Sequence, residues 1–414
     1  MAVLNSGDTA FVIFCTALVC FMTPGLALFY GGLVGARNIL SIMLQNFLCL
    51  GVVSLIWVFG GFSAAFGRDW LGLIGNPFEF FAMWDISADP NPDYAANIPF
   101  ILVFAYQMMF AVITPALITG AIVGRMRFKA YVQFIALWVV LIYLPVAHWI
   151  WGGGFLSRWG AVDFAGGIVI HTSAGFSALV AAKFLGPRPR TAGQTNAPVN
   201  LPLVAIGAGI LWFGWYGFNA GGAYQADALA AYAFINTALA GAIGMLVWLG
   251  WQWRMETQAN FSGALVGAVA GLATITPAAG YVTPFSALLI GAIGASLCYF
   301  AKGIQQRLAI DDALEVWRAH GVGGMTGAIL LGVMASSHID HISAGLGQLM
   351  IQLLAVVLVA LYASVITYLI LKTLASWGHL RVSEQAQLSG LDKALLGEEA
   401  YHLQDAPPSD NDSR

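Results

Sequence analysis

Apolar runs of about 20 residues without a charged side chain recur along most of this chain, and an α-helix needs that length to cross a bilayer. Of its 414 residues, 59% are hydrophobic and only 9% are charged. Soluble domains carry about 25% charged residues. The sequence therefore predicts an integral membrane protein that contacts the lipid bilayer. The net charge of -3 gives no indication of nucleic-acid binding.

Hydropathy, interrupted by Gly, Pro and polar residues, predicts an all-α membrane protein with about eleven transmembrane helices. The eleventh helix is long enough to lie tilted across the outside of the bundle. The start of the chain lacks the basic segment and cleavage site of a signal peptide, so the first run is expected to be a retained span. The approximate bounds are 9–35, 39–66, 99–124, 130–151, 164–185, 201–220, 228–250, 258–279, 283–303, 314–336 and 344–376.

The basic residues predict the orientation of these spans. With the N-terminus outside, fifteen of the 17 Lys and Arg residues fall in inner loops or the tail, and only Arg68 and Arg158 fall outside. Such an excess of positive charge is typical of cytoplasmic loops. It requires an odd number of spans and places the C-terminus inside. Residues 1–376 are thus predicted to form a transmembrane domain, and residues 377–414 a cytoplasmic tail.

An internal repeat relates the two halves of the chain. The sequence Ile-Thr-Pro-Ala occurs at 113–116 in the third predicted span and at 275–278 in the eighth. An aspartate eight residues before a histidine also occurs in the fifth and tenth spans, again five helices apart. Because five is odd, the halves have opposite orientations in the membrane. An inverted repeat of five plus five helices places a substrate site near the midplane, and the eleventh helix is additional.

The repeated pair consists of Asp163 with His171 and Asp312 with His320. Ionisable groups inside a membrane face the bundle interior or a cavity and mark functional sites. Two neutral imidazoles in contact could pass a proton, since each ring has one donor and one acceptor nitrogen. The alternative is that each histidine is a core residue bonded to a backbone carbonyl. Asp163 could cap its helix or add negative potential near a cation, and Asp312 is expected to be structural.

Aromatic residues gather beyond the histidines, towards the predicted outer face. An interfacial belt would explain most of them. An aromatic box beside a carboxylate also suits a small cation, because ring faces attract positive charge. With the histidines, this pattern indicates cation capture followed by proton handling. The residues are Phe110, Trp149, Trp151, Trp212, Trp215, Tyr216 and Phe218.

Several segments together resemble the ammonium transporter family, the Amt/Mep/Rh group, over nearly the whole chain. The resemblance is to the Amt branch, and it implies ammonium or ammonia transport by a homotrimer in the inner (plasma) membrane, with one pore per subunit. The segments are Pro24–Gly32, Phe110 before Ile113-Thr114, Ala147–Gly154, Asp163–Gly167 through His171, Gly214–Gly221 and His320–Val322.

The resemblance also implies roles for individual residues. His171 and His320 match the proton relay, and Phe110 and Phe218 match the pore gate. His148 is interpreted as structural. The residues expected to recruit ammonium are Trp151, Phe110, Asp163 and Gly222. The residues expected to line the pore wall are Phe29, Tyr30, Tyr143 and Trp215.

This chain departs from the family at two positions. Gly222 stands where the family has a serine whose hydroxyl binds the ion. Losing one contact to a charged donor should cost about 1.5–3 kcal/mol unless another group replaces it. Leu396 replaces a histidine in the tail, where Gly390–Asp392 resembles the regulatory segment that meets a PII-type signal protein.

The mechanism implied is capture of ammonium, loss of its proton, and passage of ammonia through an apolar pore, because a bare ion in hydrocarbon is very costly. The proton returns outside or passes along the histidines, which would make transport electrogenic. Two alternatives remain: a passive ammonia or carbon dioxide channel, and an ammonium sensor with little flux. Trp151 and Asp163 favour a transporter over the Rhesus gas channels, which lack that tryptophan. No enzyme, cofactor or metal-site motif is found, and the four cysteines show no paired spacing.

Overall fold

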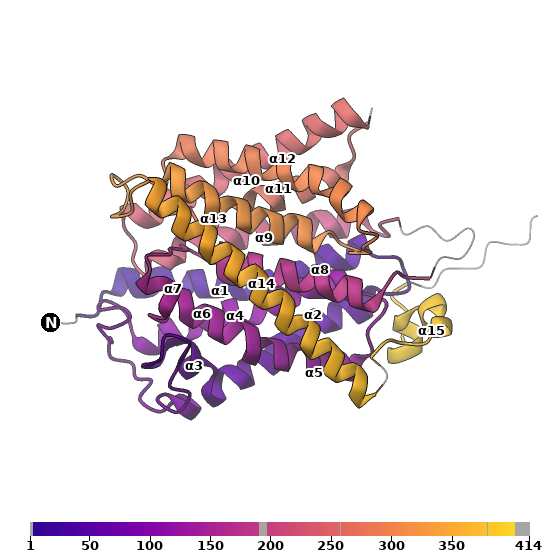
Figure 1. Ribbon diagram of the computed structural model, residues 1–414, viewed down its shortest axis with the longest axis horizontal. Coiled ribbons are helices and arrows are strands. Elements are labelled where there is room, and N and C mark those ends of the chain that lie inside the picture. Colours follow the sequence, from indigo (N-terminus) through magenta and orange to yellow (C-terminus); the bar gives the residue numbers. More distant parts are fainter. Residues whose placement is uncertain (1–2, 190–196, 257, 379, 402–414) are drawn as a thin grey trace, which may run out of the picture.

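The computed structural model describes residues 3–189, 197–256, 258–378 and 380–401 (Figure 1). Each predicted span coincides with a helical segment. Nine helices in this part of the chain are long and apolar enough to cross a membrane. The helical segments at the eleven predicted spans are α1 (Ser6–Leu33), α2 with η1 and α3 (Ile39–Ile56, Trp57–Gly61, Phe62–Phe66), α4 (Phe100–Ile122), α5 with η3 and α6 (Phe128–Trp138, Val139–Tyr143, Leu144–Ile150), η4 with α8 (Gly167–Thr172, Ser173–Leu185), α9 (Leu201–Ala220), α10 (Ala228–Met255), α11 (Phe261–Ile275), α12 (Pro284–Arg307), η6 with α13 (Trp317–Val322, Gly323–Met334) and α14 (Leu346–Trp377); α11 and the η6–α13 segment are not among the nine.

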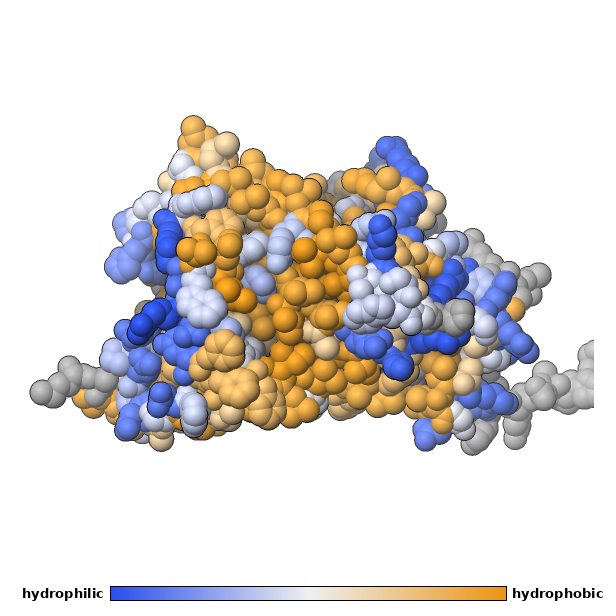
Figure 2. Space-filling model, turned by 60° about the horizontal axis from the view of Figure 1, so that its bottom comes forward, coloured by the Kyte–Doolittle hydropathy of each residue, from blue (hydrophilic) through white to orange (hydrophobic). Residues whose placement is uncertain are grey.

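The surface agrees with a membrane environment. Figure 2 shows a broad apolar band across the middle of the molecule, with hydrophilic residues gathered at its two ends. Helix α14 runs diagonally across the other helices, as expected for the long last span (Figure 1). It packs on α5, α8 and α13, while Leu361 and Val365 on its other side are 60% and 55% exposed. Such exposure of large apolar side chains suits contact with lipid.

The two helices that carry the repeated histidines cross in opposite directions. A Cβ added at Gly175, in α8, would lie 2.2 Å from Gly321 in η6, and one added at Gly324, in α13, would lie 2.6 Å from the His171 Cβ. The start of each helical segment thus lies beside the middle of the other, in antiparallel order. Glycine is required at these positions because no side chain fits between the backbones. The antiparallel crossing agrees with the inverted repeat, and the orientation relative to the membrane stays a prediction.

The segment between α3 and α4 forms a small folded cap that hydropathy did not predict. Its strands β1 (Asp69–Trp70) and β2 (Ile74–Gly75) pair antiparallel, and η2 (Phe81–Met83) and α7 (Phe155–Arg158) lie at the same end of the molecule. The buried His148 ring lies 3.0 Å from the Ala65 carbonyl oxygen and 2.8 Å from the Asp69 carboxylate. Arg158 also donates to Asp69, at 2.6 Å. These contacts agree with a structural interpretation of His148.

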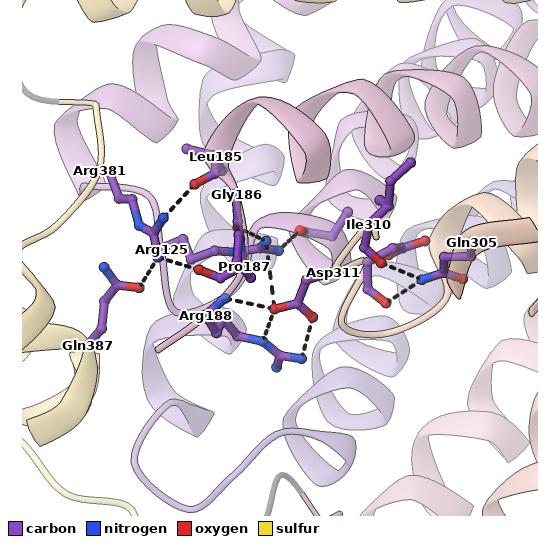
Figure 3. Close-up of polar contacts among 12 residues, drawn as sticks. Arg125, Leu185, Gly186, Pro187, Arg188, Gln305, Ile310, Asp311, Arg381 and Gln387 are labelled. Atoms are coloured by element: carbon purple, nitrogen blue, oxygen red, sulfur yellow. Dashed lines mark hydrogen bonds and ion pairs between the residues drawn. The ribbon is translucent and has the colours of Figure 1, made fainter. Parts of the chain in front are cut away.

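A polar network joins three loops at the opposite end (Figure 3). Arg188 donates three times to the Asp311 carboxylate, from its backbone N–H and Nε at 2.9 Å and from Nη2 at 2.8 Å, and the buried Arg125 lies 4.0 Å from the same carboxylate. Burial alone would raise the pKa of Asp311, but the hydrogen bonds and charge of Arg188 hold it below its ordinary value. Burial lowers the pKa of Arg125 to about 10. Loops from both halves of the repeat are thereby tied together.

The predicted tail docks on this same end. Arg381 donates to the carbonyl oxygens of Leu185 and Pro187, at 2.7 and 2.6 Å. Beyond it lie two short helices, α15 (Glu384–Ser389) and η7 (Asp392–Leu396). The Asp392 carboxylate accepts the backbone N–H groups at the start of α2, at 3.0 and 2.7 Å. The rest of the predicted tail, 402–414, lies outside the described residues.

Candidate functional site

A cavity of about 340 Å³ opens beside α4, where α6 and α9 end, and is called the outer cavity. Its lining in the described part of the chain contains three carboxylates and no lysine, arginine or histidine. This balance favours cations over anions. The lining residues are Phe66, Asp93, Tyr94, Val103, Tyr106, Gln107, Phe110, Trp151, Asp163, Phe164, Ala165, Gly222, Ala223, Tyr224, Leu229, Tyr281 and Asp340.

Three of the predicted recruitment residues are fixed against one another in this cavity. The rings of Phe110 and Trp151 meet edge to face, with centroids 6.2 Å apart. The Trp151 indole N–H donates to the backbone carbonyl of Asp163, at 2.8 Å. Because its N–H is occupied, the indole offers the cavity ring surface rather than a hydrogen-bond donor, and a ring surface attracts cations.

The Asp163 carboxylate caps the helix that carries His171. It is buried, and each of its oxygens accepts two backbone N–H groups. Four donors around one carboxylate fill its acceptor capacity, so it holds the start of η4 in place. The donors are Gly166 at 2.9 Å, Gly167 at 2.7 Å, Ile168 at 2.7 Å and Val169 at 3.0 Å.

A pair of phenyl rings closes the floor of the outer cavity. The centroids of Phe110 and Phe218 lie 4.4 Å apart, and both side chains are buried. Phe110 lines the outer cavity, whereas Phe218 lines a second cavity beyond it. The rings therefore separate the two spaces, in the position expected of a gate.

The second cavity, called the histidine cavity, has a volume of only about 20 Å³. A site needs roughly 10–15 Å³ to hold a water molecule, so this one accommodates a molecule of that size and little more. Apart from the two histidines and the aromatic rings of Tyr30 and Trp215, its lining is aliphatic or phenyl. The lining residues are Met22, Leu26, Phe29, Tyr30, Ile113, Leu117, Ile170, His171, Leu211, Trp215, Phe218, Val269 and His320.

The predicted contact between the histidines is present. His171 Nδ1 and His320 Nδ1 lie 3.2 Å apart, and the rings are nearly parallel, with an interplanar angle of 24°. When both rings are neutral, one Nδ1 must donate and the other accept, so the two tautomers differ. Both helices begin with wide π turns, a feature frequent at functional sites. The Asp312 carboxylate accepts the Trp317 N–H at the start of η6, matching Asp163 in the other half.

A third cavity, of about 220 Å³, follows at the other end and is called the inner cavity. Leu33 and Val266 line it, and each lies about one helical turn from a residue that lines the histidine cavity. Its wall includes Arg318, which pairs with Glu315 and lies over the Trp248 ring at 5.7 Å. The outer, histidine and inner cavities thus follow one another through the molecule.

Some predicted site residues lie elsewhere. Tyr143 lines none of these cavities and packs near Trp57, with ring centroids 6.4 Å apart. Trp149 donates to a loop carbonyl and lies against Tyr362, and Tyr216 stacks on another ring of the surface. The aromatic pattern therefore mixes cavity residues with residues that pack elsewhere in the structure.

Sequence reasoning also missed residues of the outer cavity. Tyr106 and Gln107 lie about one turn before Phe110 on α4, so helical spacing could have indicated them. Tyr224 has a left-handed backbone, with φ of 54°, directly after η5 (Gly221–Ala223). No sequence signal marks it. No group of three or more metal-ligating side chains that could hold an ion occurs among the residues described.

The apolar helices and their bundled arrangement define a polytopic membrane protein. The family model described as the Ammonium Transporter Family matches residues 10–401, and the chain belongs to this family. An ammonium transporter of Aquifex aeolicus is 46% identical over 408 residues, which cover 97% of this chain and 95% of the relative.

Solved structures agree with this assignment. The crystal structure of Saccharomyces cerevisiae Mep2 is similar with a TM-score of 0.84 and 32% identity, over 92% of this chain and 91% of that one. A structure titled Sensor Amt Protein is similar with a TM-score of 0.87 and 30% identity, over 94% and 98% of the two chains. Ammonium transport is thus the activity of the family, and the relatives are transporters rather than enzymes.

Proposed function

We propose that this protein captures ammonium in the outer cavity, removes its proton there, and passes ammonia through the histidine cavity to the inner side. The observation that supports this most is the change in character along the pathway. An acidic, aromatic cavity of about 340 Å³ is followed by a largely apolar one of about 20 Å³. Trp151, Phe110, Asp163 and position 222 form the recruitment site in this proposal, and Phe110 and Phe218 form the gate.

The physical reason is the cost of desolvation. An ammonium ion in the histidine cavity would lose its water, and the lining offers few groups to replace it. Neutral ammonia does not pay this cost. Phe29, Tyr30 and Trp215 form the pore wall in this proposal, whereas Tyr143, also expected there, packs near Trp57.

The released proton, in this proposal, passes through His171 and His320, which makes transport electrogenic. The 3.2 Å contact between their Nδ1 atoms supports a relay, since a shared hydrogen bond is the path along which a proton moves. Return of the proton to the outside would instead give neutral transport.

Ammonium pulses on solid-supported membranes test the relay. The wild type should give a sustained current, and His171→Ala should abolish it while ammonia permeation, measured by stopped flow, continues. His338→Ala is the control, because that histidine lies in an exposed loop. If the His171→Ala current equals that of the wild type, the proton takes another route.

A sensor with little flux is the second candidate. Gly222 and Leu396 depart from the transporter pattern, and the Sensor Amt Protein has a similar fold. A brief current on ammonium binding (the capture transient) without a sustained current would support the sensor hypothesis. Ammonia flux without a transient or a sustained electrical current would support a passive channel.

The cellular setting belongs to the same proposal. A transmembrane domain of residues 1–376 would form homotrimers in the inner (plasma) membrane. The tail of residues 377–414 would lie in the cytoplasm and meet a PII-type signal protein. The docking of α15 and η7 on the inner loops supports a tail that can influence the transport domain.

A further inference from the structure

One polar group of a residue that lines the outer cavity has no hydrogen-bond partner among the described residues. Gln107 is only 8% exposed, and its Nε2 donates to the Tyr224 hydroxyl at 2.7 Å. Its Oε1 is buried and accepts no hydrogen bond, although the residue lines the cavity. Buried carbonyl oxygens are nearly always paired, so an unpaired one beside a cavity indicates a missing donor.

The contacts of Tyr224 hold this amide in place. Its backbone carbonyl accepts from Asn97 at 2.9 Å, and its ring meets Tyr106 edge to face at 5.5 Å. The hydroxyl therefore has a fixed position. Because it receives the amide N–H group of Gln107, the amide oxygen of this cavity-lining residue is left without a hydrogen-bond partner among the described residues.

The same cavity lacks a hydroxyl at position 222. A Cβ added at Gly222 would lie 3.1 Å from the Phe164 carbonyl oxygen and 3.5 Å from its ring, so a serine fits with a small adjustment. With glycine there, the ring faces of Phe110 and Trp151 attract a cation but accept no strong hydrogen bond. Ammonium has four N–H donors and needs an oxygen acceptor when it leaves water.

We propose that Gln107 Oε1 is a hydrogen-bond acceptor for ammonium in the outer cavity and replaces the hydroxyl absent at position 222. Gln107 lies one helical turn from Phe110 on the same face of α4, so the acceptor and the ring face act on one ion. This inference rests on the proposed function, since it names a ligand of the same recruitment site.

The test is ammonium affinity in Gln107→Leu, which keeps much of the side-chain volume and removes the acceptor. The ammonium concentration at half-maximal capture current should rise roughly 10- to 100-fold, as expected for a lost hydrogen bond to a charged donor. Tyr224→Phe, which removes only the tether, should give a smaller rise. Gln107→Glu can only accept, so it should bind at least as tightly as the wild type.

Gly222→Ser in the Gln107→Leu background separates a ligand from a structural residue. A hydroxyl at position 222 should restore most of the lost affinity in the Gln107→Leu background and add much less in the wild type, where Gln107 already supplies an acceptor; equal gains in both backgrounds would show that Gln107 does not replace the hydroxyl. Unchanged affinity in Gln107→Leu, weaker binding in Gln107→Glu, or no recovery in the double variant would each overturn the inference.

The capture transient measures binding whether or not a sustained current follows. A wild type that shows neither transient nor current refutes the proposed function itself. A wild type that captures ammonium, with Gln107→Leu capturing it equally well, refutes only the role of Gln107.

Discussion

Replacing Asp163 with asparagine tests whether the carboxylate, rather than the shape of the side chain, holds the start of η4. Each oxygen accepts two buried N–H groups, at distances from 2.7 to 3.0 Å. In Asp163→Asn one oxygen becomes an NH₂ group, so two backbone donors lose their acceptor. Each unsatisfied buried donor costs about 1–3 kcal/mol, which gives a loss of about 2–6 kcal/mol.

The repeat supplies a matched control. Asp312 accepts the Trp317 N–H through Oδ2, while its Oδ1 has no hydrogen-bond partner in the part of the chain that the structure describes. In Asp312→Asn the amide can keep its oxygen on that donor, so a much smaller loss is expected. The same chemical change should therefore have unequal effects at two positions related by the repeat.

Thermal unfolding of the purified protein in detergent, followed by tryptophan fluorescence, measures the difference. Asp163→Asn should unfold at a clearly lower temperature than Asp312→Asn. Its ammonium capture should also weaken, because the backbone of Asp163 holds the Trp151 indole. Equal unfolding temperatures for both variants and the wild type would refute the reasoning from unpaired donors.

Two further predictions concern the contacts between the halves. Gly175→Ala should lower the unfolding temperature, because the added Cβ would lie 2.2 Å from Gly321. Gly209→Ala is the control and should have no such effect, because no atom lies within 4 Å of the added Cβ. An unchanged unfolding temperature in Gly175→Ala would show that the two helices can move apart. Asp311→Asn should destabilise the protein at neutral pH. Since the folded pKa of Asp311 lies below its ordinary value, its contribution is complete above about pH 4 and disappears as the pH falls through the folded pKa. The difference in unfolding temperature between Asp311→Asn and the wild type should thus vanish in acid, and a pH-independent difference would contradict the role of the Arg188 pair.

Hydropathy and the internal repeat predicted the main features of the fold. Long apolar runs specify membrane spans almost independently of their neighbours, because each helix satisfies its own backbone hydrogen bonds. The repeated histidine spacing also predicted a contact that the structure contains, between His171 and His320. This contact could be predicted from the symmetry of the repeat, since an inverted repeat brings equivalent positions together near its axis.

Features that depend on tertiary contacts were less predictable. The strands β1 and β2 are only two residues long, which is too short for the alternation of apolar and polar residues from which strands are predicted. Tyr143 and Trp149 belong to apolar helices whose faces cannot be told apart when nearly every position is hydrophobic. Gln107 was missed although it is a polar residue in an apolar helix. The sequence does not show whether its amide oxygen has a hydrogen-bond partner in the folded protein.

The hydrogen bond between the two Nδ1 atoms has a consequence for the timing of proton movement. A proton that arrived at Nε2 of His171 and left from Nε2 of His320 would shift the shared hydrogen from one ring to the other. The bond would then point the opposite way, and the first ring could not take a second proton. After each proton transfer, both rings would have to return to their starting tautomers before the next proton could pass. This return is a step of the cycle in which no ammonium moves, and it can limit the rate of transport.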